Sequence, residues 1–236
     1  MSKIKIAIQG ELGAYSHIAA EKLYKDADIK TCSTFEETFK HAYNDPSYKI
    51  VIPIENSLAG RVADIHYLLP KYKLQIHGEY FLPVEHNLLA KPEAKIEDIK
   101  YVRSHVQAIT QCQNIIAKRN FKPIISVDTA GSAKELAEGK DKSIAAIASN
   151  LSAKIYDLKI LEKNIEDEKG NVTRFLIMGK NIEQPDYTND KKFITSCIFR
   201  VKSEPSALYK CLGGFATNQV NLTKLESFSV KNTFDQ

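Results

Sequence analysis

The feature that most constrains the fold of this chain is a repeated alternation of short apolar runs with segments of helical periodicity. KIAIQG (5–10) is an apolar run that ends in Gly10, and the segment 16–24 has helical spacing. The same order recurs at 49–56 with 61–69, 99–104 with 104–120, 124–128 with 129–139, and 143–149 with 150–158. This order predicts an α/β domain with mainly parallel sheets over residues 1–180.

A second, smaller unit is predicted after residue 192. Residues 181–192 are polar, contain Pro185 and lack periodicity, which is typical of a linker. Beyond them, 193–201 and 221–230 have the composition of strands, and a helix begins near Pro205 between them. The pattern predicts a separate β-α-β unit.

Composition excludes several classes of function. The 236 residues are 43% hydrophobic and 26% charged with a net charge of +4, and no block of five or six like charges occurs. No nucleic-acid-binding stripe is therefore predicted. No run approaches the roughly 18 apolar residues of a membrane helix, and the N-terminus enters a strand without a signal peptide. Four widely spaced cysteines indicate reduced thiols in the cytoplasm, with neither a zinc site nor disulfides.

Hydroxyl and amide side chains follow four of the predicted strands, at the starts of helices. Each motif has a structural interpretation, since such residues cap helices. SHVQ, for example, has the spacing of a capping box between Ser104 and Gln107, and either Asp128 or Thr129 suits an N-cap. In the functional interpretation, strand ends of an α/β sheet gather around a ligand. The candidate ligand contacts are Ser16 in GELGAYS, Asn56 and Ser57 in PIENSLAG, His105 and Gln107 in SHVQ, and Thr129 in DTAGSA.

Thr173 in NVTRF (171–175) has three interpretations. Asn171-Val172-Thr173 matches a glycosylation sequon, which the predicted compartment makes irrelevant. A β-branched residue at a strand start is ordinary. The third interpretation is a hydroxyl that takes part in catalysis, and the four other strands that end in polar residues favour it. Because no metal cluster, phosphate-binding loop or Cys-His pair is present, the sequence predicts a polar cleft for a small carboxylate, without cofactor or metal.

Taken in order, GELGAYS, PIENSLAG, HNLLA (86–90), SHVQAITQC (104–112), AAIAS (145–149) and NVTRFLIMG (171–179) resemble the prephenate dehydratase family. The resemblance implies a catalytic domain at 1–180 built as two lobes of the periplasmic-binding-protein type II kind. Lobe one would comprise 1–78 and 160–180, and lobe two 79–159. The segment 193–236 resembles the start of an ACT domain, a β-α-β-β-α-β unit of which only about half fits.

The resemblance implies a carbon–oxygen lyase that converts prephenate to phenylpyruvate in phenylalanine biosynthesis, with loss of carbon dioxide and water. Thr173 matches the family's essential threonine and would donate to the departing hydroxyl. Ser16, Asn56, Ser57, Gln107 and Thr129 would hold the substrate, with Phe175 beside them and Arg174 as a weaker candidate that could instead anchor structure. His105 and Glu55 are alternative proton sources if Thr173 only positions the substrate.

The regulatory part departs further from the family pattern. Its phenylalanine site would include Ser206, Ala207, Leu208, Glu226 and Ser227, but Ser206 replaces a usual glycine and Phe228 a usual arginine. His17 and Val106 depart from the family in the catalytic part. The resemblance implies a homo-oligomer, a dimer or tetramer, with L-phenylalanine as an effector. Two alternatives stay open: arogenate as the substrate, or a two-lobed protein that senses an aromatic acid.

Overall fold

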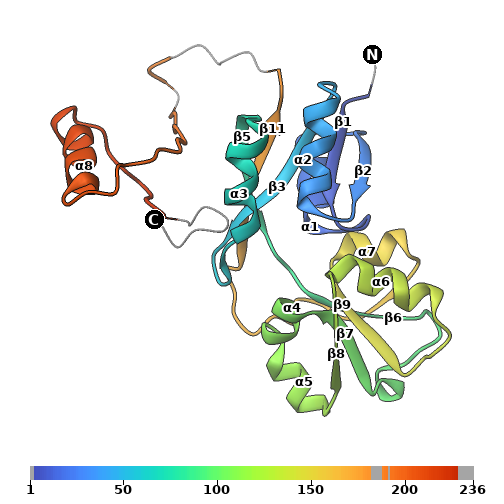
Figure 1. The fold of residues 1–236 in the computed structure, drawn as a ribbon. Coiled ribbons are helices and arrows are strands. Elements are labelled where there is room, and N and C mark those ends of the chain that lie inside the picture. The colour runs from blue at the N-terminus through green and yellow to red at the C-terminus, as the bar shows by residue number, and fades with distance from the viewer. Residues whose placement is uncertain (1–2, 182–187, 191, 228–236) are drawn as a thin grey trace. The chain divides into compact units, whose positions relative to one another are not determined.

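The computed structural model describes residues 3–181, 188–190 and 192–227, and the chain divides into two compact units, 1–183 and 184–236. The first unit contains two sheets, and each is covered by helices on both faces (Figure 1). It confirms the expected two-lobed α/β class, with two lobes joined by two crossing segments.

The first lobe is built on a sheet with the strand order β2-β1-β3-β11-β5, and β4 pairs with β3. Strands β1 to β3 are parallel, whereas β11 runs antiparallel between β3 and β5. The sheet is therefore mixed rather than mainly parallel, because β11 returns from the other lobe. The elements of this lobe are β1 (Lys5–Gln9), α1 (Tyr15–Leu23), β2 (Asp28–Cys32), α2 (Phe35–Asn44), β3 (Tyr48–Asn56), β4 (Gly60–Arg61), α3 (Ala63–Tyr72), β5 (Gln75–Pro83) and β11 (Val172–Gly179).

The apolar run of β11 is buried on both of its faces. Leu176 and Met178 pack into the core beneath α2 and α3, while Phe175 and Ile177 pack into the core beneath α1. Successive side chains of a strand point to opposite faces, so a strand buried on both sides reads as a continuous apolar run. This double burial fixes the register of β11, and therefore the place of Thr173 at its start.

The second lobe has the strand order β10-β6-β9-β7-β8. Helices α4 and α5 cover one face of this sheet, and α6 and α7 cover the other. Strand β6 is antiparallel to both of its neighbours, and β9, β7 and β8 are parallel. The elements are β6 (Asn87–Ala90), η1 (Ile96–Asp98), β7 (Tyr101–His105), α4 (Val106–Thr110), α5 (Gln113–Arg119), β8 (Lys122–Ser126), α6 (Thr129–Glu138), β9 (Ile144–Ala148), α7 (Asn150–Ile155) and β10 (Lys159–Glu162).

The chain passes between the lobes after Pro83 and after Glu162, a few residues later than the expected boundaries at 78/79 and 159/160. Strand β5 stays in the first sheet as far as Pro83, because β11 pairs with it from Val172 to Gly179. Strand β10 belongs to the second sheet, where it pairs with β6. Both crossing segments, 84–86 and 163–171, consequently contribute residues to the region where the lobes meet.

The second unit contains one regular element in its described residues, helix α8 (Ala207–Thr217). The expected helix is therefore present, but the expected strands are not: residues 193–201 and 221–227 form no ladder, and 228–230 lie outside the described residues. A strand requires a partner for its backbone N–H and C=O groups, and two strands alone are marginally stable. Apolar side chains on either side of α8, among them Ile194, Ile198 and Leu225, are accordingly exposed.

Candidate active site

Thr173 lies at the start of β11, where the two flanking strands of the first lobe also end. It pairs with Asn56 of β3 on one side and with Leu82 of β5 on the other. Its residue surface is 8% exposed, so the hydroxyl sits at the edge of the core rather than in open solvent. The Asn56 side chain reaches across the ladder and its Nδ2 donates to Thr173 Oγ1 over 2.9 Å.

The backbone determines the direction of this hydrogen bond. Asn56 Oδ1 accepts from the backbone N–H groups of Leu58 (3.0 Å) and Ala59 (2.8 Å), which can only donate. The other end of the amide, Nδ2, must therefore be the donor toward Thr173 Oγ1. Within the described part of the chain, Thr173 Oγ1 has no acceptor for its own hydrogen among the hydrogen bonds identified. The threonine proton is consequently available to a ligand.

The same polarity extends from Asn56 toward the second lobe. Asn56 Nδ2 also donates to Asn171 Oδ1 over 2.6 Å, so the Asn171 amide must present its nitrogen at the opposite end. Asn171 Nδ2 donates to Gln111 Oε1 over 2.9 Å. Asn171 is only 3% exposed, which rules out the folded chain as a glycosylation acceptor at this residue. Burial thereby excludes the sequon interpretation for the folded chain.

Gln111 Oε1 has a second neighbour, the ring of His86 in the first crossing segment. His86 Nε2 lies 2.9 Å from Gln111 Oε1, and His86 Nδ1 lies 2.9 Å from the hydroxyl of Tyr15. The Tyr15 hydroxyl is also 2.7 Å from the carbonyl oxygen of Glu85. Six side chains, Tyr15, His86, Gln111, Asn171, Asn56 and Thr173, thus form one continuous polar chain through both lobes and both crossing segments.

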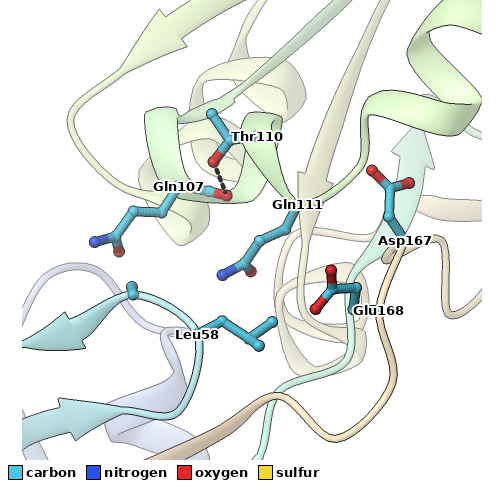
Figure 2. Close-up of a pocket in the computed structure, with 7 residues that line it drawn as sticks. Leu58, Gln107, Thr110, Gln111, Asp167 and Glu168 are labelled. Carbon is cyan, nitrogen blue, oxygen red and sulfur yellow. Dashed lines mark hydrogen bonds between the residues drawn. The ribbon is translucent and has the colours of Figure 1, made fainter.

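A pocket with a volume of about 490 Å³ opens where the lobes meet, next to this polar chain. That volume lies within the range of small-molecule sites. Figure 2 shows the Gln107 side chain on α4 and the Gln111 side chain just after the end of that helix, both on the second-lobe side of the pocket, with Leu58 of the first lobe opposite. The residues that line the pocket are Leu58, Ala59, Gln107, Thr110, Gln111, Asp167 and Glu168. Thr173 is not in the wall itself but is joined to it, because Asn56 holds Leu58 and Ala59 and Asn171 holds Gln111.

Ser57 holds structure at the edge of the site, and Ser16 is buried in a helix. Ser57 Oγ accepts from the backbone N–H of Val172 (2.9 Å) and donates to the carbonyl of Gly170 (3.2 Å). It therefore braces the second crossing segment against the end of β3 and has no hydrogen left for substrate. Ser16 is buried in the first turn of α1, and Ala14, not Ser16, occupies the N-cap position.

The SHVQ segment has a different cap from the predicted one. Ser104 is fully buried, and its hydroxyl donates to the carbonyl of Ile147 (2.6 Å) in the neighbouring strand. His105 is the N-cap of α4, and its Nδ1 accepts from the backbone N–H of Gln107 (3.2 Å). Burial lowers the pKa of His105, with Asp128 acting in the opposite direction, so the ring is neutral and carries its hydrogen on Nε2. The Gln107 side chain is free to line the pocket.

In DTAGSA, the helix is capped by Asp128, whose Oδ1 accepts from the backbone N–H of Gly131 over 2.6 Å. This selects one of the two predicted caps. Thr129 is consequently not needed as a cap and stands half-buried at the first position of α6.

Two of the predicted substrate contacts are placed elsewhere. Arg174 is on the face of β11 opposite Thr173, and its Nε and Nη2 lie 2.7 and 2.6 Å from Glu79 Oε2 on β5. Arg174 therefore anchors β11 to β5, as expected if it faces away from Thr173, because neighbouring residues of a strand point to opposite faces. Phe175 is 1% exposed and packs among Ile6 and Ile8 in the core, so it does not face a ligand. Because successive side chains of β11 alternate between its two faces, Phe175 points into the core beneath α1.

The GELG turn joins the two lobes. The carbonyl of Gly13 accepts from Ser149 Oγ (2.6 Å) and Ser152 Oγ (3.1 Å) at the start of α7. Gly13 has φ +92°, and a Cβ there would stand 2.5 Å from Ser152 Oγ. The departure at His17 is also explained, because its Nδ1 accepts from the backbone N–H of Gly13 (3.0 Å), as a capping carboxylate would.

The residues predicted for the phenylalanine site belong to the second unit. Ser206 precedes α8 with φ +64°, and Ala207 and Leu208 form its first turn. Glu226 and Ser227 lie in the extended segment beyond the helix, where Lys224 Nζ is 3.1 Å from Glu226 Oε1.

One group of potential metal ligands occurs in the described part of the chain, Cys32, Glu37 and His41, whose ligand atoms lie within 4.8 Å of one another. Glu37 Oε2 is already bound to the backbone N–H and hydroxyl of Ser33. Burial raises the pKa of the Cys32 thiol and keeps it protonated, which opposes metal binding. The donor set therefore fits an ordinary helix start better than a metal centre.

Sequence reasoning missed four members of the polar chain: Tyr15, His86, Gln111 and Asn171. Their partners in the polar chain are 25 to 115 positions away in sequence, so no local spacing links them. The available signal was weaker: each of the four stands inside a family motif, Tyr15 in GELGAYS, His86 in HNLLA, Gln111 in SHVQAITQC and Asn171 in NVTRFLIMG.

The fold and the pocket together define a two-lobed α/β protein with a small-molecule site where its lobes meet. A family profile described as prephenate dehydratase matches residues 6–183, and the chain belongs to that family. It is 41% identical to arogenate dehydratase 2 of Petunia hybrida over 96% of this chain, although it spans only 57% of that relative. It is 39% identical to the bifunctional N-acyl-homoserine lactone acylase/prephenate dehydratase of Komagataeibacter europaeus, with 97% and 81% of the two chains covered.

A solved structure supports the same assignment. The prephenate dehydratase of Arthrobacter aurescens, determined in complex with L-Phe, superposes with a TM-score of 0.83 at 25% identity, covering 95% of this chain and 76% of that one. Among the described residues, no helix combines the length and the apolarity that crossing a bilayer requires.

Proposed function

We propose that this chain is a prephenate dehydratase, which converts prephenate to phenylpyruvate with loss of carbon dioxide and water, and that Thr173 is its catalytic hydrogen-bond donor. The observation that carries the proposal is the direction of the Asn56–Thr173 bond. Because Asn56 Nδ2 donates to Thr173 Oγ1, the threonine hydrogen is left for the oxygen of the departing hydroxyl.

The chemistry asks little else of the protein. As the carbon–carbon bond to the ring carboxylate breaks, its electron pair enters the ring, which becomes aromatic while the hydroxyl leaves from the opposite carbon. Carbon dioxide departs without a base, and one proton is needed to turn the leaving hydroxide into water. A neutral donor aimed at the oxygen where charge develops is the type of group that stabilises such a transition state.

Substrate binding is assigned to the neutral donors around the pocket. Gln107 and Gln111 face it from the second lobe, and the half-buried Thr129 begins a helix on the same lobe. His105 carries its hydrogen on Nε2, which makes it the alternative proton donor if Thr173 only positions the leaving group. Ser57, Arg174 and Phe175 are left out of the substrate contacts because their groups are engaged elsewhere.

The direct test compares Thr173→Ala and Thr173→Ser with the wild type on prephenate. Losing one donor at a developing oxyanion costs about 2.7–4 kcal/mol, so we expect Thr173→Ala to lower kcat by about 100- to 1000-fold. Thr173→Ser keeps the hydroxyl and should retain most of the activity. Thr31→Ala, on the edge strand β2, is the matched control. Equal kcat for wild type and Thr173→Ala would contradict the catalytic assignment.

Arogenate is the alternative substrate, and it differs from prephenate by an amino group in place of the keto group. The Petunia relative is named as an arogenate dehydratase, and the Komagataeibacter relative as a prephenate dehydratase. Measuring kcat/KM for both substrates on one preparation decides between them. Turnover of neither, with tight binding of an aromatic acid, would instead support a sensor.

For the second unit, we propose part of an ACT regulatory domain that takes L-phenylalanine, in a cytoplasmic homo-oligomer. Support comes from the Arthrobacter structure, which was solved with L-Phe, and from Ser206 and Leu208 at the start of α8. The test is the molecular mass and the activity in solution with and without phenylalanine. A mass of one chain and an unchanged rate under both conditions would contradict regulation by this unit.

A further inference from the structure

Helix α5 begins without a side-chain cap from its own N-cap residue. Cys112 occupies that position, but its side chain is buried in the core of the second lobe with Ile109 and Ile116, and it makes no capping hydrogen bond. The first N–H groups of a helix have no partner inside the helix, and a capping side chain normally accepts from one of them. For α5, the acceptor has to come from another part of the chain.

Asp167 of the second crossing segment supplies that acceptor. Its Oδ2 accepts from the backbone N–H of Gln113 over 2.7 Å, and its Oδ1 accepts from the backbone N–H of Asn114 over 3.0 Å. The two donors lie 54 and 53 positions earlier in the sequence. Hydrogen bonds from backbone N–H groups to a carboxylate are among the stronger ones in proteins. The crossing segment therefore caps a helix of the second lobe.

The same crossing segment also holds Gln111, the residue just before Cys112, by its backbone and by its side chain. The backbone N–H of Asp167 donates to the Gln111 carbonyl over 2.7 Å. Asn171 Nδ2 donates to Gln111 Oε1 over 2.9 Å. Because Gln111 lines the pocket, the place of its amide depends on how the segment 167–171 is fastened to the start of α5.

Asp167 lines the pocket too, where a carboxylate is unfavourable for a substrate that itself carries two carboxylates. Figure 2 shows the Asp167 carboxylate and the Gln111 side chain pointing in different directions. Both Asp167 oxygens accept backbone hydrogens at the start of α5, so the charge is engaged there. A capping role explains why a carboxylate stands at this position, whereas a direct role in binding an anion does not.

We propose that Asp167 is a positioning residue, which caps α5 and thereby fixes the Gln111 amide in the wall of the pocket. Its effect on turnover rests on the proposed function, whereas the cap itself does not. Without the carboxylate, the first turn of α5 would lose two hydrogen bonds. The junction of α4 and α5, which carries Gln111, would then be held less firmly against the crossing segment.

The first experiment measures the cap without any substrate, by amide hydrogen exchange. Gln113 and Asn114 are exposed residues in the first turn of α5, so protection of their amides has to come from the Asp167 carboxylate. Asp167→Ala should raise both exchange rates about tenfold, and Asp167→Asn, which keeps one acceptor oxygen, should raise them less. Unprotected amides in the wild type would overturn the inference, whether or not the protein turns over prephenate.

The second experiment measures kcat/KM for prephenate. We expect Asp167→Ala to lower it about tenfold, the equivalent of one lost helix cap. If the carboxylate only repelled the substrate, its removal would raise kcat/KM instead, so the sign of the change separates the two roles. Should Asp167→Ala not fold, Asp167→Asn gives the same sign with a smaller loss.

Thr34→Ala is the matched control for the loss of a helix cap as such. Thr34 Oγ1 caps α2 of the first lobe by accepting from the backbone N–H of Glu37 over 3.0 Å. Its loss should lower the denaturant midpoint of unfolding about as much as Asp167→Ala does, but leave kcat/KM near that of the wild type. A loss of kcat/KM as large as that of Asp167→Ala would mean that any lost cap impairs turnover, which would overturn the positioning role.

A double-variant cycle tests whether the effect passes through Gln111. Adding Asp167→Ala to Gln111→Ala should lower kcat/KM by less than about a further twofold. Independent, multiplying losses would overturn the positioning role. Full kcat/KM of Asp167→Ala beside an active wild type would refute this inference alone. No turnover by the wild type would refute the proposed function instead, and hydrogen exchange would still decide the cap.

Discussion

Replacing Asn56 by aspartate changes one group of nearly identical shape and reverses the polarity on which the candidate active site depends. The backbone N–H groups of Leu58 and Ala59 donate to Asn56 Oδ1, and a carboxylate accepts from them equally well. The second carboxylate oxygen would take the place of Nδ2, 2.9 Å from Thr173 Oγ1 and 2.6 Å from Asn171 Oδ1. The side chain therefore keeps its anchor, while the hydrogen bonds that Asn56 Nδ2 donates to Thr173 Oγ1, Asn171 Oδ1 and the carbonyl of Val172 become impossible.

These contacts allow two effects of the substitution to be estimated, one on kcat and one on the unfolding free energy. The Thr173 hydroxyl would donate to the new carboxylate and would no longer be available to the leaving group. On the oxyanion-site scale, that loss is about 2.7–4 kcal/mol, or roughly 100- to 1000-fold in kcat. The carboxylate would also face Asn171 Oδ1, and the resulting reversal or loss of that bond should cost about 1–3 kcal/mol of unfolding free energy.

The assay is kcat on prephenate together with denaturant unfolding of each variant. Asn44→Asp, at the exposed end of α2, introduces the same charge change and should leave both quantities near those of the wild type. On a Thr173→Val background, Asn56→Asp should lower the residual kcat by less than about threefold, because no hydroxyl remains to be redirected.

A pH profile provides an independent check on the same reasoning. Once the introduced carboxyl is protonated, it can donate again, so the activity of Asn56→Asp should recover relative to the wild type as the pH falls. The reasoning is refuted if Asn56→Asp has wild-type kcat at pH 7.5. It is also refuted if the variant loses the same factor with and without the Thr173 hydroxyl, since the effect would then not pass through that group.

Three further predictions concern the residues that support the site. Gly13→Ala should lower the unfolding free energy by at least about 2 kcal/mol, because φ there is +92° and the added Cβ would lie 2.5 Å from a side chain of α7. Gly78→Ala, whose Cβ meets nothing within 4 Å, is the control, and denaturant unfolding of both variants measures the difference. Arg174→Met should cost stability, measured as Tm, but leave kcat within about threefold, because its partner is Glu79 and not substrate. Burial lowers the pKa of His86, so as the pH falls below the unfolded-state value of about 6.5 the unfolded chain binds the proton first. The unfolding free energy should therefore decrease as the pH falls, by at most about 1.4 kcal/mol per pH unit, and His86→Gln should show a flatter dependence between pH 5.5 and 6.5.

The sequence was sufficient for the parts of the fold that depend on local pattern. Alternation of apolar runs and helical segments predicted the α/β class, whereas the two lobes were implied by the family resemblance; the run after Thr173 is indeed a strand buried on both faces. The sequence pattern failed where the structure depends on a pairing partner from another part of the chain. The segment 193–201 has the composition of a strand, but no neighbouring strand pairs with it among the described residues.

Local motifs also misassigned some polar groups for the same reason. S-x-x-Q suits a capping box, yet Ser104 donates into the sheet because β9 lies beside it, and His105 takes the cap. In the sequence, Asn171 belongs to a glycosylation sequon, but in the folded protein its amide is buried between Asn56 and Gln111. Contacts at separations of 43, 60 and 115 residues decide the roles of Ser104 and Asn171, and spacing along the chain carries no record of them.

The chemistry of the site explains why amides and hydroxyls, rather than charged groups, form the polar chain. Among the described residues that line the pocket, none is basic, and the Arg174 guanidinium of β11 is bound to Glu79. A buried charge carries a desolvation cost and can change its protonation state, whereas an amide with its oxygen fixed by backbone N–H groups can only donate at its nitrogen. Asn56 transfers that direction to Thr173 on one side and to Asn171 and Gln111 on the other. The proposed reaction needs no base, only donors at fixed places, and it is matched by a site whose hydrogen positions are determined by the backbone itself.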